Sequence, residues 1–291
     1  MNEMIERFYE FAGIRWRVRF PKAFTYQDDD ILDTFAAEHD GSVDHTLVFE
    51  PVDRLSEPEG ECVFCESNRQ FYADGDVRIR YQDSAPDSYA LAGLRIRREG
   101  KSSCIQVKND YLCNGFTAKM ILNAMEAEHV IVQKCGFLLH ASFIKWRGEA
   151  ILFTAPSGTG KSTQADLWCS CRGAELMNGD RAAVMLRNGR AYACGLPFCG
   201  SSGVSKNACL PLKAIVYLSQ APVTTVHRLN GLRAFSRVWE GCCVNVWDRE
   251  DLQMCTDTVI ETVGTVPVYR LACTPDETAV EALERAFTEM E

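Results

Sequence analysis

The sequence predicts an α/β protein, α+β overall, in which a small antiparallel β-rich region precedes a larger α/β domain. In the first hundred residues, short runs alternate apolar and polar residues with the period of half-buried strands. Further along, apolar strands alternate with helical patterns, and a turn of small residues joins one strand to a helix. We therefore expect an N-terminal β-rich region over residues 1–112 and a second domain over residues 113–291.

The strands expected in the N-terminal region carry arginine on their polar face. In residues 14–20, aromatic and aliphatic side chains alternate with three arginines. Similar runs at 77–81, 94–97 and 104–108 are separated by turns at 74–76 and 99–101, and an acidic, proline-containing loop spans 50–61. The arginine face could hold an anionic partner, although a solvated surface is the favoured interpretation.

A helix is expected to connect the two regions. Apolar residues recur with helical spacing from Thr117, a suitable cap, to Cys135, where a glycine follows as a stop signal. A strand over 137–144 then carries His140, and a turn at 147–148 leads into the next strand.

The central motif of the chain is ILFTAPSGTGKST, residues 151–163. Its apolar residues indicate a buried strand, a turn of small residues follows, and a helix begins at its end. Such a turn points backbone N–H groups inward, and the positive end of the helix faces the same place, which suits a chain of phosphates. The motif therefore predicts a phosphate-binding loop, with one departure, because Ala155 stands where the usual pattern has glycine. The expected nucleotide-binding residues are Ala155, Pro156, Ser157, Gly158, Thr159, Gly160, Lys161, Ser162 and Thr163.

Four side chains near the loop are candidates for metal binding or chemistry. Lys161 is expected to contact the β- and γ-phosphates, and the Ser162 hydroxyl to bind Mg²⁺. Asp180 follows a short strand, 175–178, one element after the loop helix, where an acidic residue can complete the magnesium shell. An ordinary surface turn is the alternative for Asn-Gly-Asp. We include the adjacent Arg181 among the candidate catalytic residues.

The remainder of the chain completes an α/β pattern. A hairpin is expected at 182–193 about an Asn-Gly turn, followed by a loop, 195–203, whose composition is typical of loops that close over substrates. Then come a strand at 212–218 with 223–229 as its possible partner, helices at 232–239 and 250–263, and a strand at 266–271 whose proline suggests an edge or strand-start position. A capping box at 274–277 begins the C-terminal helix.

Composition limits the possible classes of function. The chain has 291 residues, of which 46% are hydrophobic and 24% are charged, as in ordinary globular proteins. Its formal net charge of −9 argues against a nucleic-acid partner. No apolar run is long enough to span a bilayer, and the N-terminus lacks the pattern of a signal peptide. We therefore expect a cytoplasmic protein without a membrane partner.

Fourteen cysteines are scattered along the chain, and reduced thiols are the default for a cytoplasmic protein. Cys62 and Cys65 form one C-x-x-C pair, but no second pair or histidine cluster accompanies them, as a structural zinc site would require. Buried small residues are the favoured interpretation over metal or redox function.

Three motifs together resemble a known family. His140-Ala141-Ser142, the loop at 155–163 and the Asn-Gly-Asp at 178–180 resemble the catalytic domain of HPr kinase/phosphorylase, whose nucleotide-binding core is shared with phosphoenolpyruvate carboxykinase. The tail PVYRLACTPDETAVEAL, residues 267–283, resembles uncharacterised bacterial members of the HPr-kinase-like group. The resemblance covers roughly residues 135–290, and it implies an HPr kinase-like P-loop fold for the second domain.

The resemblance also implies phosphate contacts from the loop, Mg²⁺ at Ser162 and Asp180, and a histidine near the reacting phosphate, His140. One departure matters, because the family has a second aspartate, the general base, where this chain has Gly179. His140 is the candidate replacement, since a neutral imidazole could accept the proton of the acceptor hydroxyl. A buried structural histidine is the alternative.

The leading functional hypothesis is an ATP- and Mg²⁺-dependent kinase that transfers the γ-phosphoryl group to a hydroxyl of a small molecule or peptide. The alternatives are an HPr-kinase-like serine protein kinase, with the N-terminal sheet as docking surface, and a nucleotide-binding regulator without catalysis. The sequence leaves open the identity of the acceptor, the donor among ATP, GTP and pyrophosphate, and the formation of a homo-oligomer.

Overall fold

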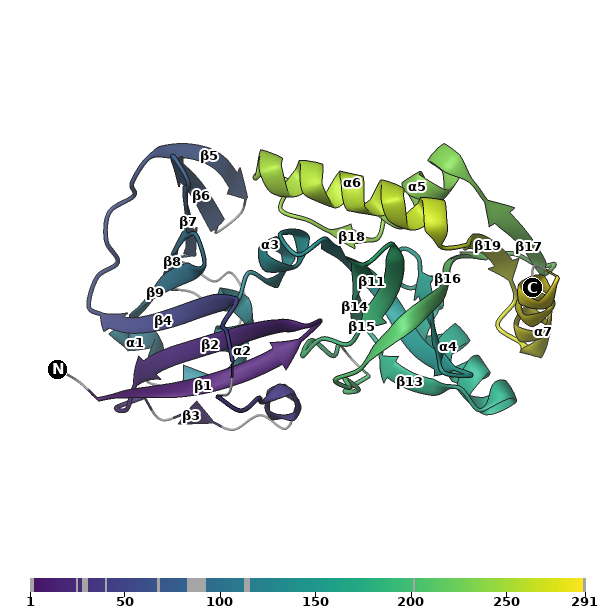
Figure 1. The fold of residues 1–291 in the computed structure, drawn as a ribbon, viewed down its shortest axis with the longest axis horizontal. Coiled ribbons are helices and arrows are strands. Elements are labelled where there is room, and N and C mark those ends of the chain that lie inside the picture. Colours follow the sequence, from purple (N-terminus) through teal and green to yellow (C-terminus); the bar gives the residue numbers. More distant parts are fainter. Residues whose placement is uncertain are drawn as a thin grey trace. The chain divides into compact units, whose positions relative to one another are not determined.

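The computed structural model is a mixed α/β protein, α+β overall (Figure 1). It describes residues 3–24, 26–27, 31–39, 41–66, 69–82, 93–112, 116–200 and 202–289. No helix in these ranges is long and apolar enough to cross a membrane. The chain divides into two compact units, Met1–Ala127 and Glu128–Glu291. This division lies inside the helical segment expected at 117–135, and the domain boundary expected after residue 112 stays a prediction.

The first unit is built on one eight-stranded sheet in which parallel and antiparallel pairs are mixed. Its strand order is β1-β2-β4-β9-β8-β7-β6-β5. The strands are β1 Met4–Phe11, β2 Ile14–Pro21, β4 His45–Val52, β5 Glu61–Glu66, β6 Arg69–Asp74, β7 Val77–Gln82, β8 Leu94–Glu99 and β9 Ser102–Lys108. The expectation of a small antiparallel sheet is wrong, because β4 pairs in parallel with both β2 and β9. In both parallel pairs a long stretch of chain separates the two partners, residues 22–44 between β2 and β4 and residues 53–101 between β4 and β9, as parallel pairing requires.

Smaller elements accompany this sheet. They are the 3-10 helix η1 Leu32–Phe35, the short helix α1 Asn109–Leu112, and the strands β3 Tyr26–Gln27 and β10 Phe116–Thr117, which pair in parallel.

The alternating strands predicted in this region are confirmed, but the arginines are not all solvated. In β2, alternate residues are fully buried and the intervening arginines are half-buried. In β8, by contrast, Arg95 and Arg98 are buried. The loop after β4 covers this strand, because Arg95 Nη2 lies 2.6 Å from Glu59 Oε1 and its Nε donates to the Tyr81 hydroxyl at 2.7 Å. Burial of the Arg95 charge is tolerated because these partners satisfy it.

Two short helices replace the single helix expected over 117–135. They are α2, Ala118–Ala124, and α3, Ala127–Val132. Glu126 lies between them with a φ of 45°, in the left-handed region that interrupts an α-helix. Thr117 precedes α2, as expected of a cap, but makes no side-chain capping bond.

The described residues of the second unit contain nine strands, and five of them form a closed ring of hydrogen-bonded neighbours. The strands are β11 Gly136–Trp146, β12 Glu149–Thr154, β13 Glu175–Asn178, β14 Arg181–Arg187, β15 Arg190–Cys194, β16 Cys209–Gln220, β17 Thr225–Leu229, β18 Cys242–Cys243 and β19 Val268–Cys273. The ring runs β12-β11-β14-β15-β16 and returns to β12. The long strand β11 pairs with β14 up to His140 and with β12 from Ala141 onward. His140 therefore lies where β11 changes partners.

Three parallel strands of this unit, β12, β16 and β19, lie side by side. Helices α4 Lys161–Arg172 and α7 Glu277–Thr288 pack on one side of them. Helices α5 Gly231–Trp239 and α6 Arg249–Thr265 pack on the other side, and Figure 1 shows α4 and α6 on opposite sides of the strands. The carboxyl ends of the parallel strands meet at one edge, which is where ligands bind in α/β sheets of this kind.

The C-terminal half has the expected order of elements, with two corrections. Strand β17 pairs with β19 and not with β16, because β19 lies between them. The N-cap of α7 is Asp276, whose carboxylate accepts from the Thr278 N–H, rather than the Thr274 that a capping box implies. Pro267 lies directly before β19, and this strand-start position suits a residue without an N–H.

A disulfide between Cys194 and Cys209 joins β15 to β16. The expectation of reduced thiols is therefore wrong for this pair. Cys62, Cys65 and Cys135 are among the cysteines of the described chain that are free.

Candidate functional site

The expected phosphate-binding loop lies between β12 and α4, at the carboxyl edge of the parallel strands. Gly158 and Gly160 have φ angles of 76° and 116°, in the left-handed region that glycine enters without steric cost. Ala155, at the position of the usual first glycine, is buried and is not one of the left-handed residues of the described chain. Alanine therefore fits there without backbone strain.

Lys161 is the first residue of α4, and only 8% of its surface is exposed. Its Nζ donates a hydrogen bond to the Ala155 carbonyl oxygen, 3.0 Å away across the loop. Burial lowers the pKa of Lys161, and the charge of Asp180 partly offsets this effect. A buried cation that is hydrogen-bonded to a neutral carbonyl attracts anions strongly.

The turn before Asp180 is shaped by Asn178, which is fully buried. Asn178 Oδ1 accepts hydrogen bonds from the N–H groups of Asp180 at 2.9 Å and Arg181 at 3.0 Å. Asn178 Nδ2 donates to the carbonyl oxygens of Leu196 and Phe198, in the loop after β15. One amide side chain thus fixes the Asp180 turn and joins the expected substrate loop to it.

Gly179 lies against the same loop. A Cβ built at Gly179 would lie 2.6 Å from Ser202 Cβ, which is closer than a Cβ atom approaches other atoms in folded proteins. A Cβ at Gly200 would likewise lie 2.8 Å from Asp180 Cβ. The loop, whose Ser201 lies outside the described residues, therefore occupies the space that a side chain at position 179 would need.

The candidate catalytic side chains form a cluster of charges around Asp180. His140 Nδ1 lies 3.6 Å from Asp180 Oδ1, and Arg181 Nε lies 3.2 Å from Asp180 Oδ2. Glu128, in the first turn of α3, holds Arg181 from the other side, with Oε1 3.7 Å from Nη1. Lys161 is near enough for its charge to act on His140. The structure thus brings His140, Lys161, Asp180 and Arg181 together.

The surroundings of His140 favour the neutral imidazole. Burial lowers the pKa of His140, the charges of Lys161 and Arg181 lower it further, and Asp180 opposes them. With a pKa below the usual 6.5, the ring is mostly neutral at pH 7. Its side chain is nevertheless 38% exposed, which does not fit a buried structural histidine.

The other predicted residues lie in the loop and the first turn of α4. Pro156 and Ser157 are exposed, Thr159 is half-buried, and Ser162 and Thr163 are exposed. Ser162 directly follows Lys161, so its hydroxyl belongs to the helical turn that carries the buried cation. Shared binding of one Mg²⁺ by Ser162 and Asp180 stays a prediction.

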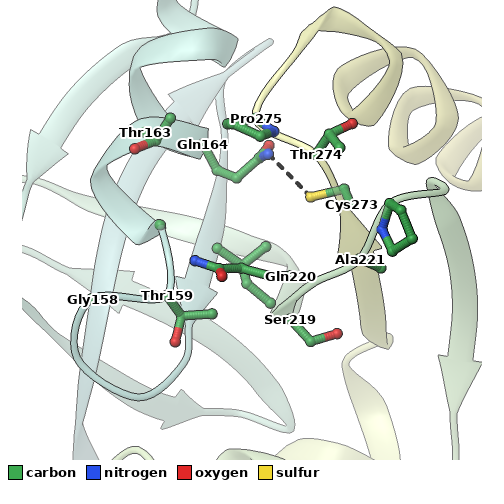
Figure 2. A pocket seen from close by; sticks show the side chains of 13 residues that line it. Gly158, Thr159, Thr163, Gln164, Ser219, Gln220, Ala221, Cys273, Thr274 and Pro275 are labelled. Carbon is green, nitrogen blue, oxygen red and sulfur yellow. Dashed lines mark hydrogen bonds between the residues drawn. The ribbon is translucent and has the colours of Figure 1, made fainter.

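A pocket of about 630 Å³ opens beside the loop (Figure 2). Its walls come from the loop and α4 and from the ends of β16 and β19 with the residues that follow them. Figure 2 shows the Gln220 side chain extending from the end of β16 toward the loop that carries Thr159. The lining residues are Gly158, Thr159, Gly160, Thr163, Gln164, Leu218, Ser219, Gln220, Ala221, Pro222, Cys273, Thr274 and Pro275.

Two buried side-chain oxygens in the wall of this pocket have no hydrogen-bond partner among the residues that the structure describes. They are Gln164 Oε1 and Ser219 Oγ, both shielded from solvent. The Gln164 amide nitrogen does have a partner, the Cys273 sulfur at 3.4 Å. Because buried polar atoms are nearly always paired, the two unpaired atoms indicate that a ligand or water belongs beside them.

Sequence reasoning missed several residues of this site. Asn178 could have been found, because asparagine before Gly-Asp favours a turn in which its side chain bonds the following backbone. Gln164, Ser219 and Glu128 carry no local signal, since they reach the site only through the packing of separate elements.

The fold and site define an α+β protein in which a glycine-containing strand–loop–helix turn adjoins a cluster of ionisable side chains. The family model described as SynChlorMet cassette protein ScmC matches residues 113–288. This match spans more than half of the chain, and the chain therefore belongs to the ScmC family.

One solved structure similar to this chain is that of the Hpr(Ser) kinase/phosphatase from Coxiella burnetii. The two chains are 12% identical, with a TM-score of 0.30, over 53% of this chain and 97% of that chain. No curated protein matches the chain. The relationship to HPr kinase remains a prediction from the sequence motifs.

Proposed function

We propose that this protein binds ATP with Mg²⁺ at the 155–163 loop and transfers the γ-phosphoryl group to a hydroxyl of a small molecule or peptide. The observation that carries this proposal is the position of Lys161, a buried cation near Asp180 that follows a loop with two left-handed glycines. Phosphoryl transfer depends mostly on positioning and on stabilisation of negative charge. A P-loop arrangement of these residues would supply both.

The residues near the loop are suited to hold magnesium. Ser162 offers a hydroxyl and Asp180 a carboxylate, and Mg²⁺ binds through one or two such oxygens together with phosphate oxygens and water. The ion supplies neutralisation of phosphate charge when bound. Arg181, which Glu128 and Asp180 hold between them, is placed to add positive charge on the same side.

His140 is our candidate for the general base. Its lowered pKa keeps the imidazole unprotonated near pH 7, and its partial exposure lets an acceptor hydroxyl approach. A neutral imidazole can take the hydroxyl proton as the oxygen attacks the phosphoryl group. The HPr kinase family has a carboxylate at the position that corresponds to Gly179. A side chain has no room there in this chain, because Ser202 fills that space.

The pocket beside the loop supports a nucleoside as the other half of the ligand. Its lining contains hydroxyl, amide and apolar groups but no charged side chain, which suits a neutral base and ribose. Its volume lies in the range of small-molecule sites. The unpaired Gln164 and Ser219 oxygens could accept hydrogen bonds from such a group.

A second candidate function is a nucleotide-binding regulator that performs no phosphoryl transfer. The observation that favours it is the packing of Ser202 against Gly179, which leaves the usual base position without a side chain. Both functions need the same nucleotide site, so one binding experiment tests what they share.

The binding test compares Lys161→Ala with Lys145→Ala. Lys145 carries the same charge on β11, but it is exposed and paired with Glu175 at 3.3 Å. By calorimetric titration with ATP and Mg²⁺, Lys161→Ala should weaken binding by about 2–3 kcal/mol, while Lys145→Ala should not change it. Equal affinity in the two variants would show that the phosphates do not lie at this loop.

The catalytic test uses γ-labelled ATP with Mg²⁺ and a cell extract. A kinase should move label to a metabolite, peptide or protein with the parent chain and not with Lys161→Ala. A protein that binds ATP but moves no label under these conditions would be the regulator.

A further inference from the structure

The C-x-x-C pair of the first unit lies on β5, the strand at one end of the eight-stranded sheet. Cys62 and Cys65 are both exposed, and their sulfur atoms lie 3.3 Å apart. The favoured interpretation from the sequence, buried small residues, is therefore wrong for this pair. The two thiols are neighbours on an accessible surface.

A β-bulge brings the two thiols together. In a regular strand, residues three apart point to opposite faces and are separated by about 10 Å along the chain. Here the pairing with β6 shifts register between Cys62 and Phe64, so that Cys62 faces Tyr72 while Phe64 faces Phe71. A bulge of this kind moves the following residues to the other face and bends the strand. It explains how Cys62 and Cys65 meet.

The separation of the Cys62 and Cys65 sulfur atoms is close to that of a disulfide bond. A disulfide has sulfurs about 2.05 Å apart, so the atoms need to approach by only about 1.3 Å from their present 3.3 Å. The register shift in the strand already accompanies close approach of the two side chains. Ring closure across so short a segment also costs little chain entropy.

A metal site fits these residues less well. A structural zinc ion takes four ligands, of which this pair would supply two. In the part of the chain that the structure describes, the grouping of three or more metal-ligating side chains is His129, Asp248 and Asp251, in the second unit. The pair therefore has two sulfurs and no further ligand close by within those residues.

We propose that Cys62 and Cys65 are a reversible dithiol–disulfide site that exchanges with small-molecule disulfides. One cysteine thiolate attacks the small disulfide, forms a mixed disulfide and releases the first thiolate. The second cysteine, as thiolate, then attacks the protein sulfur and releases the second thiolate, which closes the Cys62–Cys65 bond. Two protein thiols are oxidised, the small disulfide is reduced to two thiols, and the two protons lost by the cysteines pass to the leaving groups.

The test exposes the reduced full-length protein to a series of glutathione disulfide concentrations, traps free thiols by alkylation and maps the peptides by mass spectrometry. Contact with Cys62 raises the pKa of the Cys65 thiol, so the exchange is run at about pH 8.5. Cys135, an exposed free cysteine on the same chain, is the internal control. The Cys62–Cys65 peptide should lose two hydrogens and carry no glutathione, at a disulfide concentration at least about tenfold below that which modifies Cys135.

Two variants complete the test. In Cys62→Ser and in Cys65→Ser, the remaining cysteine should carry glutathione as a mixed disulfide, because no second thiol is present to release it. Both positions are exposed, so circular dichroism should show an unchanged fold. The proposal is overturned if Cys62 and Cys65 of the parent each carry glutathione, or if both stay free under conditions that modify Cys135.

Discussion

At the scale of single residues, the site depends on how neighbours set the charge of each side chain. Lys161 and His140 both have lowered pKa values, chiefly because of burial. For histidine, a pKa below 6.5 means a neutral ring at pH 7, whereas the pKa of lysine is lowered from a much higher ordinary value, 10.5, and the charge of Asp180 opposes the decrease. The same surroundings therefore supply one positive group and one proton acceptor.

His140→Gln tests the second of these roles. If His140 is the base, kcat for phosphoryl transfer should fall by about 10²- to 10⁴-fold, with ATP affinity unchanged. The parent rate should fall on the acid side as the His140 ring of the nucleotide-bound enzyme becomes protonated, because the protonated ring cannot accept a proton. The variant should lose this acid limb. His227→Gln, an exposed histidine on β17, is the matched control, and an acid limb that persists in His140→Gln would exclude the role.

Gly179→Ala tests the packing of the loop against the Asp180 turn. The added methyl group would overlap Ser202, so the free energy of unfolding should fall by about 1–3 kcal/mol. Ser202→Gly in the same chain should restore most of the loss, which a double-mutant cycle from chemical denaturation would measure. Simple additivity of the two changes would mean that the residues do not touch.

The site residues that could be predicted from the sequence are those that a local pattern specifies. The loop glycines, Lys161 and Asp180 follow from spacing along the chain, and the structure brings Lys161 and Asp180 into electrostatic contact. The roles of Glu128 and Gln164 could not be predicted, because they depend on which element packs beside which. The burial of Arg95 was missed for the same reason, since Glu59 reaches it from a loop.

At the scale of elements, the strands and helices with clear periodicity were predicted and their partners often were not. The alternation in β2 and the hairpin β14–β15 are confirmed. The parallel pairs of β4 and the insertion of β19 between β16 and β17 were missed, because pairing depends on long-range closure. The break between α2 and α3 was missed because Glu126 has no strong preference for a left-handed φ.

Asn178→Ala tests the link between two elements, the Asp180 turn and the 195–203 loop. The variant removes the Asn178 partner of the Asp180 and Arg181 N–H groups and of the Phe198 carbonyl, while the Leu196 carbonyl keeps the Ser205 hydroxyl, so we expect a loss of stability of about 1–3 kcal/mol. Asn178→Asp keeps the acceptor oxygen but not the donor, so it should loosen the loop and spare the turn. Hydrogen exchange of the two segments would separate the effects. Equal protection in parent and both variants would contradict the assigned role.

At the scale of the whole molecule, every residue of the candidate site belongs to the second unit. The loop, the charge cluster and the pocket all lie within Glu128–Glu291, and both large hydrophobic clusters that surround them are drawn from the same residues. The division into a β-rich first part and an α/β second part was predictable from the change of periodicity. The eight-stranded extent of the first sheet was not, since β1, β5 and β6 alternate weakly.

A fragment of residues 126–291, which keeps α3 whole, should therefore fold and bind ATP with the affinity of the full chain. Circular dichroism would establish the fold and calorimetric titration the binding constant. The same fragment with Lys161→Ala serves as the control. A folded fragment that fails to bind would mean that the first unit contributes to the nucleotide site.

The proximity of His140 to Lys161 and Arg181 has a thermodynamic consequence if a phosphate chain occupies the loop. The negative charge of the ligand would offset the two cations and raise the pKa of His140 from its lowered value. At pH values between the pKa of the empty site and that of the occupied site, the occupied site would then hold more protons than the empty one, so association would be coupled to proton uptake and would strengthen as the solution becomes more acidic. Within that range, nucleotide binding and phosphoryl transfer would make opposite demands on His140. A lower pH would favour binding of the nucleotide, but it would also remove the neutral imidazole that the transfer step needs.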